Sequence, residues 1–504
     1  MAKLGQRLWQ QLKYDLGSFR AAFSALPTLS PGLQTFDVPL DGGQKRIHFR
    51  LEQDGSGVLF VDVTDVIHLN PTAAEMAFFA LCGVPQNQAR SGLNRRLHPQ
   101  DRPQMQAELT KIYTMVDRFR APETGCPTCA VRDLQRTALF SHRAKAPYKA
   151  DLAVTYGCNN ACQHCYNEPD RFDMASLTTG DWKRVIDILN KQGVPHLIFT
   201  GGEATLNPDL PELIEYADGL GHVVGLNTNG RSLSHLPYVE KLTGAGLNHV
   251  QITLGSSRPA VHDAVMNARS FHQTVRGIQN AVASRLHTIT NTTLMRRNMD
   301  HVEEIIDFLY DLGIRTFAMN GMIYSGGGFA DPHAIPEEEM PSLLVRVRDH
   351  AADKGMKFLW YTPTEYCRMS PVELEIGAKR CNAGEYSICI EPNGDVLPCQ
   401  SFYVSAGNIL RDDWSQIWGS ELFRTFRDRE DDPVWAGLPE KCWECPDLPL
   451  CGGGCRIERE ARDGNRIVGA DSLACGTCRR GNGNGRSGSD TRSTTFISLE
   501  NIGV

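Results

Sequence analysis

The chain has 504 residues, a formal net charge of −7 and 22% charged residues, so it is long enough for two to four domains and its charge suggests no nucleic-acid partner. It contains no run of about 18 apolar residues, which argues against a transmembrane span. Its 16 cysteines cluster at metal-ligand spacing, unlike the disulfide frameworks of small secreted domains. With no apolar region of a secretory signal at the N-terminus, we expect a cytoplasmic protein.

Residues 1–35 predict a basic helix that has apolar side chains along one side at Leu8, Leu12, Leu16 and Phe19. Such a helix suits docking against another part of the protein, and contact with a membrane surface is the alternative.

Residues 36–120 predict a small winged-helix-like domain in which strands precede helices. The stretch "RIHFRL" alternates apolar and polar residues, and "GVLFVDVTDVIHL" follows with a turn near Asp62 to Asp65. Asn70 is a good helix N-cap and Pro71 suits the first helical position, so a helix is expected to begin there. Further helical sequence runs through "QARSGLNRRL" and "QMQAELTKIYTMVDRF". Cys82, in the apolar run of the first helix, is expected in the core.

Residues 121–149 form a predicted linker that contains "GCPTC". Cys126 and Cys129 are either a zinc half-site or redox pair, or two unligated thiols.

Strands and helices alternate from residue 150 to residue 320. The expected strands are "DLAVTY", "HLIFT", "HVVGLNTN", "HVQITL", "TITNTTL" and "TFAMN". This pattern predicts an α/β fold with a parallel sheet, most simply a partial (βα)6 barrel. Active sites of such barrels lie at the C-terminal ends of the strands. A bridging segment, residues 321–366, follows and contains the glycine-rich "SGGGF".

Three cysteines directly follow the first expected barrel strand, in "CNNACQHC": Cys158, Cys162 and Cys165. A [4Fe–4S] cluster normally takes four thiolate ligands, so three leave one iron open to a small molecule. Zinc is the alternative, but structural zinc sites need four protein ligands and no fourth is adjacent.

CxxxCxxC in this position resembles the radical S-adenosylmethionine (SAM) enzymes. The resemblance implies that SAM binds the open iron and that an electron from the cluster cleaves it to a 5′-deoxyadenosyl radical, which abstracts a hydrogen atom. The "TGGEATLNPDL" stretch after the second strand resembles the family's GGE motif, which implies that the SAM amino group is held by Gly201, Gly202 and Glu203.

Polar residues at the ends of later strands are expected to contact the ribose or methionine part of SAM, with turn capping as an equal alternative: Asn227, Asn229, Thr253 and Ser256. This chain has "TLGSS" where relatives often have Ser-x-Asp-Gly, which leaves the last two assignments open.

Residues 367–478 contain a second group of cysteines, including "CWECPDLPLCGGGC". Their spacing is similar to that of the SPASM extension of peptide-modifying radical SAM enzymes. The resemblance implies two auxiliary [4Fe–4S] clusters. The outer one would be held by Cys442, Cys445, Cys451 and Cys475, and the inner one by Cys381, Cys399 and Cys455.

The fourth ligand of the inner cluster is left open by the sequence. Cys367 is the first choice. Cys389, in a predicted hairpin around "PNGD", is the second, although it is equally suited to be a buried thiol. An inner cluster that keeps one iron open for substrate is a further possibility, and Cys478 is an additional ligand candidate beside Cys475.

The strands leading to "LNPTAAEM" resemble the peptide-recognition domain of ribosomal-peptide maturation, similar to the carrier of pyrroloquinoline quinone (PQQ) biosynthesis. Such domains bind a leader peptide as an added strand; a structural cap on the barrel is the alternative. Residues 479–504 are expected to be a flexible tail, although the final "FISLENIGV" could dock as a strand on an unspecified partner.

These resemblances together imply an oxidoreductase that modifies a ribosomally made precursor peptide by forming a thioether or another crosslink, or by epimerisation. The implied cofactors are SAM, its cluster and two auxiliary clusters, and the implied electron donor is a flavodoxin or ferredoxin. No catalytic acid or base is identified. The alternatives are a sulfatase-maturating or haem-pathway enzyme and, in another class, a non-catalytic iron–sulfur carrier or scaffold.

Overall fold

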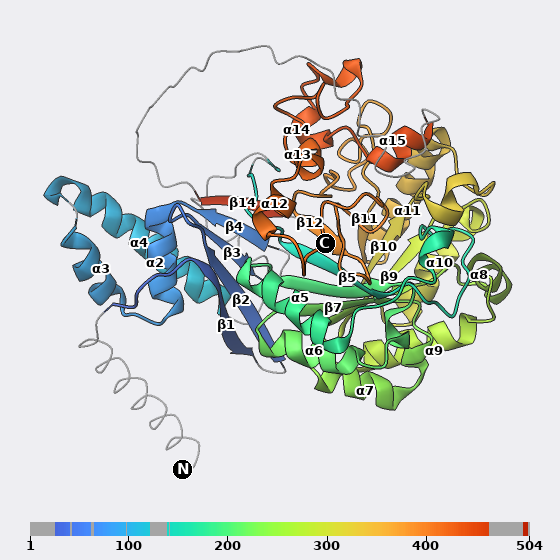
Figure 1. The fold of residues 1–504 in the computed structure, drawn as a ribbon, viewed down its shortest axis with the longest axis horizontal. Helices are drawn as coiled ribbons and strands as arrows, with labels where there is room; N and C mark the ends of the chain where they lie inside the picture. The colour runs from blue at the N-terminus through green and yellow to red at the C-terminus, as the bar shows by residue number, and fades with distance from the viewer. Residues whose placement is uncertain are drawn as a thin grey trace. The chain divides into compact units, whose positions relative to one another are not determined.

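The structure is a computed structural model that describes residues 26–40, 43–61, 65–96, 98–120, 139–140, 142–462 and 497–501. The chain divides into two compact units, shown in Figure 1: the first comprises residues 1–138 with 482–502, and the second comprises residues 139–481. Among the described residues no helix is long and apolar enough to cross a membrane. Five predicted features lie outside the described residues: the helix up to residue 25, the turn that begins near Asp62, the Cys126–Cys129 pair, Cys475 and Cys478.

The first unit is built on an antiparallel meander of four consecutive strands. Their bounds are β1 (Gly32–Leu40), β2 (Gly43–Leu51), β3 (Gly57–Val61) and β4 (Asp65–Leu69). The predicted order of strands before helices is confirmed, but β1 begins inside the segment that the sequence assigned to the N-terminal helix.

Three helices follow the meander: α2 (Pro71–Leu81), α3 (Gln86–Asn94) and α4 (Arg102–Phe119). The expected start of α2 is confirmed, because the Asn70 side chain accepts a hydrogen bond from the Ala73 amide at 2.8 Å and Pro71 occupies the first turn. The helices and one face of the sheet share an apolar core. The prediction that Cys82 lies in this core is wrong: it is exposed where α2 ends.

A fifth strand, β14 (Ile497–Asn501), pairs antiparallel with β4 at the edge of this sheet. The strand expected in "FISLENIGV" is therefore confirmed and its partner is identified. The prediction of a flexible tail over residues 479–504 fails for these five residues.

The second unit contains a nine-stranded sheet in the order β11-β10-β9-β8-β7-β6-β5-β12-β13. Six parallel strands correspond to the six predicted ones: β5 (Lys149–Thr155), β6 (His196–Gly201), β7 (Val223–Thr228), β8 (His249–Thr253), β9 (His287–Thr293) and β10 (Thr316–Asn320). The predicted barrel repeat is confirmed, and the carboxyl ends of these strands meet at one edge.

The sheet extends beyond the predicted repeat on both sides. β11 (Lys357–Trp360), from the segment expected only to bridge, pairs parallel with β10. On the other side, β12 (Ser387–Ile390) pairs parallel with β5, and β13 (Val396–Leu397) completes the hairpin expected around "PNGD". The cysteine-rich region therefore begins as part of the barrel sheet.

Helices cover the outer face of the parallel sheet (Figure 1). They are α5 (Thr179–Lys191), α6 (Leu210–Gly219), α7 (Leu236–Gly244), α8 (Pro259–Met266), α9 (Phe271–Ala283), α10 (Val302–Asp311) and α11 (Met340–Asp353). In α5 the buried residues fall on one helical stripe, at Trp182, Val185, Ile186 and Leu189. This stripe joins the apolar core to which β5 contributes Ala150, Leu152 and Val154.

The remaining described part of the chain contains short helices separated by long loops: α12 (Trp414–Trp418), α13 (Glu421–Arg427), α14 (Leu448–Cys451) and α15 (Arg456–Arg462).

Candidate functional site

The loop that follows β5 carries Cys158, Cys162 and Cys165, all of them free thiols. It rests on the end of α8: the Ala161 amide donates to the Met266 carbonyl at 3.2 Å, and Cys162 Sγ lies 3.4 Å from Met266 Sδ. These contacts place the three thiols at the carboxyl edge of the sheet, where the sequence predicted the active site.

A glycine-rich loop, Gly326 and Gly327 of "SGGGF", supports the cysteine loop from another side. The Gly327 amide donates to the Cys165 carbonyl at 2.7 Å. A Cβ at Gly326 would lie 2.7 Å from that same carbonyl oxygen, and one at Gly327 would lie 2.7 Å from the Gln163 carbonyl oxygen. No side chain fits at either position, so this run, to which the sequence assigned no role, is part of the site.

The GGE motif joins the ends of β5 and β6. The Gly202 amide donates to the Thr155 carbonyl at 2.8 Å, and the Glu203 amide donates to the Gly157 carbonyl at 2.9 Å. Gly201 has a φ of 135°, and a Cβ there would lie 1.9 Å from the Thr155 oxygen. Both glycines are therefore required for the strand ends to approach each other beside Cys158.

The Glu203 carboxylate is buried and occupied by groups of the protein. It accepts hydrogen bonds from the Thr228 hydroxyl at 2.7 Å, the Asn229 amide at 2.7 Å and the Thr205 hydroxyl at 2.6 Å. In this arrangement it fixes the end of β7 against the end of β6. Contact between this carboxylate and a SAM ammonium group stays a prediction.

Asn229 links the end of β7 to the cysteine loop, since its side-chain amide donates to Asn159 Oδ1 at 2.6 Å. Arg231, which the sequence did not single out, donates to Asn160 Oδ1 at 3.0 Å. The predicted residues Asn227 and Thr253 are half-buried near the ends of β7 and β8, and their contact with SAM stays a prediction.

Ser256 is fully buried and engaged within the protein. Its hydroxyl lies 2.7 Å from His301 Nε2 and accepts a hydrogen bond from the Arg258 amide at 3.0 Å. Because Arg258 is the N-cap residue that directly precedes α8, this geometry favours the turn-capping alternative for Ser256.

The donor set of the cysteine loop fits an iron–sulfur cluster. Burial raises the pKa of the Cys158 thiol to about 11, although a hydrogen bond from the Asn160 amide opposes the shift, and burial also raises the pKa values of Cys162 and Cys165. Such thiols ionise when iron takes the place of the proton. Within the described chain, no group of three or more His, Cys, Asp or Glu is arranged to hold a single metal ion, and a cubane instead spreads its ligands around four irons.

The C-terminal cysteines form two groups. In the inner group, burial and the neighbouring Cys381 thiol raise the pKa of Cys399 to about 12. The same two causes, with a smaller effect of Cys399, raise the pKa of Cys455. These three cysteines, which are far apart in the sequence, are therefore brought together as predicted for the inner cluster, while the cluster itself stays a prediction.

Three successive glycines separate Cys451 from Cys455, and all have left-handed backbones, with φ of 62° at Gly452, 75° at Gly453 and 70° at Gly454. A Cβ at Gly453 would lie 2.5 Å from Leu438 Cδ2. This turn lets two cysteines only four positions apart point into different groups.

Cys367 lies beside the outer group. The Tyr366 amide donates to Cys451 Sγ at 3.3 Å, the thiols of Cys367 and Cys451 interact electrostatically, and Lys441 Nζ lies 3.5 Å from Cys367 Sγ. The sequence assigned Cys367 to the inner group, so the structure puts it next to a different set of ligands from the expected one.

Cys389, the second choice for the inner cluster, is fully buried on β12. It belongs to an apolar cluster with Ala153, Tyr156 and Leu397. This environment favours the alternative that Cys389 is a core thiol.

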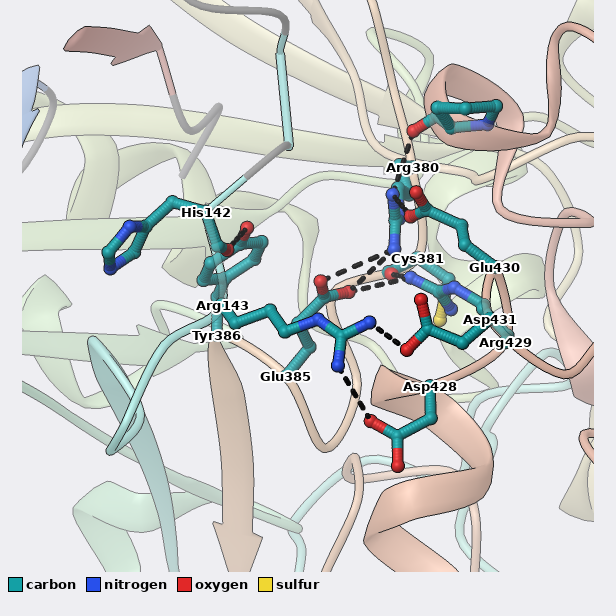
Figure 2. Close-up of polar contacts among 11 residues, drawn as sticks. His142, Arg143, Arg380, Cys381, Glu385, Tyr386, Asp428, Arg429, Glu430 and Asp431 are labelled. Atoms are coloured by element: carbon teal, nitrogen blue, oxygen red, sulfur yellow. Dashed lines mark hydrogen bonds and ion pairs between the residues drawn. The ribbon is translucent and has the colours of Figure 1, made fainter. Parts of the chain in front are cut away.

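A buried ion network around Glu385 is shown in Figure 2. It connects the Cys381 segment to α14, the short helix that ends at Cys451. Glu385, 5% exposed, accepts from Arg380 at 3.3 Å and from Arg429 at 2.7 Å. Arg429 also donates to the Cys381 carbonyl at 2.6 Å, and Arg380 donates to the Pro449 carbonyl at 2.7 Å. One carboxylate thus positions two arginines that together support both cysteine groups.

A second network connects the cysteine loop after β5 to the C-terminal region. The Tyr403 hydroxyl donates to the Tyr166 carbonyl at 3.1 Å, and the Arg171 guanidinium lies 4.2 Å from the centre of the Tyr403 ring. Arg171 also pairs with Glu391, which accepts from the Tyr156 hydroxyl at 2.9 Å. Sequence spacing carried no signal for these contacts.

Comparison with known proteins agrees with this arrangement. The Radical SAM superfamily matches residues 152–309, and the iron–sulfur cluster-binding SPASM domain matches residues 381–446. The mycofactocin maturase MftC of Mycobacterium tuberculosis is 30% identical over 329 residues, which cover 63% of this chain and 80% of the maturase. The PqqA peptide cyclase of Streptomyces rochei is 29% identical over 344 residues, which cover 66% of this chain and 90% of the cyclase.

The chain therefore belongs to the radical SAM superfamily and carries a SPASM domain. This membership implies a SAM-binding [4Fe–4S] cluster and auxiliary iron–sulfur clusters. The crystal structure of Streptococcus suis SuiB bound to its precursor peptide SuiA is similar, with a TM-score of 0.57 at 17% identity, and the match covers 82% of this chain and 94% of SuiB. At that identity the likeness supports the fold alone.

Proposed function

We propose that this chain is a peptide maturase that modifies a ribosomally made precursor by radical SAM chemistry. The observation that carries the proposal is the cysteine loop itself: three free thiols at the carboxyl end of β5, locked against the GGE turn by backbone hydrogen bonds. The names of the relatives, a maturase and a peptide cyclase, support a peptide as the substrate class.

Cys158, Cys162 and Cys165 would hold the SAM-binding cluster, which when bound supplies the electron for reductive cleavage of SAM. Gly201 and Gly202 let the GGE turn pack directly against β5 and the start of the cysteine loop, because any side chain there would meet backbone oxygens of Thr155, Tyr156 and Gly157. Asn229 and Arg231 hold the cysteine loop from the end of β7, which fixes its geometry before the cofactor arrives.

The inner auxiliary cluster would be held by Cys381, Cys399 and Cys455. The outer one would be held by Cys442, Cys445 and Cys451. The position of Cys367 beside Cys451 supports Cys367 as its fourth ligand, with Cys475 as the alternative. In either case all ligands besides Cys475 belong to the described chain.

The oxidoreductase assignment depends on the product. A thioether or other crosslink removes a pair of hydrogen atoms from the peptide, so the electron left after hydrogen abstraction needs an acceptor, and the inner cysteines would hold one close to the barrel. An epimerisation is redox-neutral and needs none. A flavodoxin or ferredoxin would supply the electron for SAM cleavage, and a cytoplasmic location stays a prediction.

The first unit would recognise the leader of the precursor by strand addition, since its four-stranded meander and the apolar helical layer packed on it are not needed for the chemistry of SAM. Main-chain hydrogen bonds would supply affinity, and alternate side chains would supply specificity.

The test is co-expression with any short reading frame found beside the gene, followed by mass spectrometry of the encoded peptide and an assay for 5′-deoxyadenosine. The proposal predicts 5′-deoxyadenosine together with either a loss of hydrogen from the peptide or an inverted α-carbon. 5′-Deoxyadenosine that forms while no encoded peptide is altered in mass or stereochemistry would contradict a peptide substrate.

A further inference from the structure

The edge of the first unit's sheet is occupied by the chain's own C-terminal segment. β3 pairs with one side of β4, and β14 pairs with the other side. The pairing with β14 is continuous over five positions, from Ile497 opposite Leu69 to Asn501 opposite Asp65. A strand has only two sides, so β4 has no further side on which to accept a peptide.

β14 has the character of an added peptide. The other four strands are consecutive in the sequence and form a meander, whereas β14 comes from the opposite end of the chain. Its sequence alternates apolar Ile497 and Leu499 with polar Ser498 and Glu500, which is the pattern of a strand that buries one face. Antiparallel addition of such a segment to a sheet edge is one of the common modes of peptide recognition.

β4 is also the better of the two edges for strand addition. Its residues Ile67 and Leu69 belong to the same apolar core as α2, so a strand beside β4 lies next to the boundary between sheet and helix layer. The opposite edge strand, β1, contains Pro39, which has no amide hydrogen to donate to a ladder.

We propose that the β4 edge is the docking site for an extended peptide, that Ile497–Asn501 occupies it as an intramolecular substitute, and that the precursor's leader must displace this segment to bind. The claim that the precursor's leader displaces this segment rests on the proposed function. A segment on the same chain competes at an effective concentration of roughly millimolar, so a leader whose intrinsic dissociation constant is about micromolar binds the intact chain more weakly than a chain without β14.

The experiment compares three full-length chains that carry reconstituted clusters: wild type, Ser498→Pro with Leu499→Pro, and Ser487→Pro with Gly488→Pro. Because alternate amides of a strand face its neighbour, the first pair of prolines removes at least one donor from the β4 ladder. The second pair adds the same number of prolines outside β14. The probe is fluorescein-labelled FISLENIGV peptide, and anisotropy reports its binding.

The proposal predicts that the labelled peptide binds the Ser498→Pro/Leu499→Pro chain at least tenfold more tightly than either of the other two chains. A chain that ends at Thr495 should match the proline variant. Equal far-ultraviolet circular dichroism spectra and equal iron content in all chains would show that both units are folded. Equal binding to all chains, or binding to none, would overturn the proposal.

A competition arm tests the leader. Unlabelled precursor should displace the labelled peptide from the proline variant, whereas precursor carrying a proline in its leader should not. If the enzyme modifies the precursor and the precursor fails to displace the peptide, the shared site is wrong and the proposed function stands. If no 5′-deoxyadenosine forms in the wild-type chain, the proposed function is wrong, and the anisotropy comparison still decides whether β14 occupies a docking site.

Discussion

The two cysteine regions of the second unit bring their thiols together in different ways. The loop after β5 brings three thiols together within eight residues, and backbone contacts to α8, the GGE turn and Gly327 hold it in place. The C-terminal region gathers its thiols from segments that are up to 88 residues apart, Cys367 to Cys455, and relies on a left-handed glycine turn and a buried ion network. A local ligand set can be recognised from spacing alone, whereas a dispersed one depends on tertiary contacts.

The largest effect is expected from the loop itself. Replacing Cys158, Cys162 and Cys165 together with Ala should remove about four of roughly twelve irons and abolish SAM cleavage, because no other thiols lie in that loop. Iron analysis after anaerobic reconstitution measures this. Iron that stays at the wild-type level would show that the loop does not bind a cluster.

Removal of a ligand of the outer auxiliary cluster should separate SAM cleavage from peptide modification. Cys442→Ala or Cys451→Ala should leave 5′-deoxyadenosine formation measurable while peptide product disappears, because the radical originates at the loop after β5. Chromatography of both products from one reaction provides the comparison. Normal peptide product from both variants would show that the auxiliary site is dispensable. Far-ultraviolet circular dichroism serves as the control for folding, since metal binding itself stabilises such domains.

The ion network should matter more for the dispersed ligands than for the local ones. Glu385→Gln leaves Arg429 buried without its carboxylate partner and leaves Arg380 with Glu430 alone. Breaking a buried ion pair in this way typically costs about 3–5 kcal/mol. We expect loss of auxiliary-cluster iron with retention of the cluster held by the loop. Glu430→Gln is the matched control, since this partner of Arg380 is 30% exposed and its replacement should cost far less. Equal iron loss from both sites would show that the network stabilises the whole unit.

Much of the local arrangement could be predicted from the sequence. The six parallel strands, the position of the three thiols after the first of them, the "PNGD" hairpin and the N-cap at Asn70 follow from periodicity and from turn and cap chemistry that act over a few residues. The dispersed contacts could not be predicted in this way. The roles of Gly326, Arg380 and Arg429 depend on segments more than 40 residues away. Cys367 was assigned to the inner cluster because some members of the resembled family have a cysteine shortly before the position of Cys381, although it lies beside Cys451.

Cys367 and Cys389 offer a sharper test of the dispersed group. Cys367→Ser should alter the spectroscopic signature of the outer cluster and lower its iron occupancy, whereas Cys389→Ser should leave cluster iron unchanged and only weaken the apolar cluster around it. Electron paramagnetic resonance of the reduced variants distinguishes the sites. Altered inner-cluster signals in Cys367→Ser would restore the assignment made from the sequence.

The smallest effect is expected at the amino ends of β6 and β8, at the opposite ends of the strands from Cys158, Cys162 and Cys165. His196 Nε2 and His249 Nε2 lie 2.7 Å apart, and burial, followed by the charges of His287 and Lys149, lowers the pKa of His249 to about 3. In the unfolded chain this imidazole takes up a proton near pH 6.5, whereas in the folded chain it stays neutral down to about pH 3. The free energy of unfolding is therefore unaffected by His249 above pH 6.5 and decreases as the pH falls below that value. At pH 5.5 the free energy of unfolding should fall by about 1 kcal/mol less in His249→Gln than in the wild type. The difference in melting temperature between pH 5.5 and pH 7.5 measures this. An unchanged pH dependence would show that the pair does not contribute.

The most direct test of the account is the production of 5′-deoxyadenosine by the reconstituted chain under anaerobic conditions with SAM and dithionite, compared with the variant that lacks Cys158, Cys162 and Cys165. The account predicts 5′-deoxyadenosine from the intact chain, more of it when precursor is present, and none from the variant. Equal amounts from both chains, or none from an intact chain that carries its full complement of iron, would contradict it.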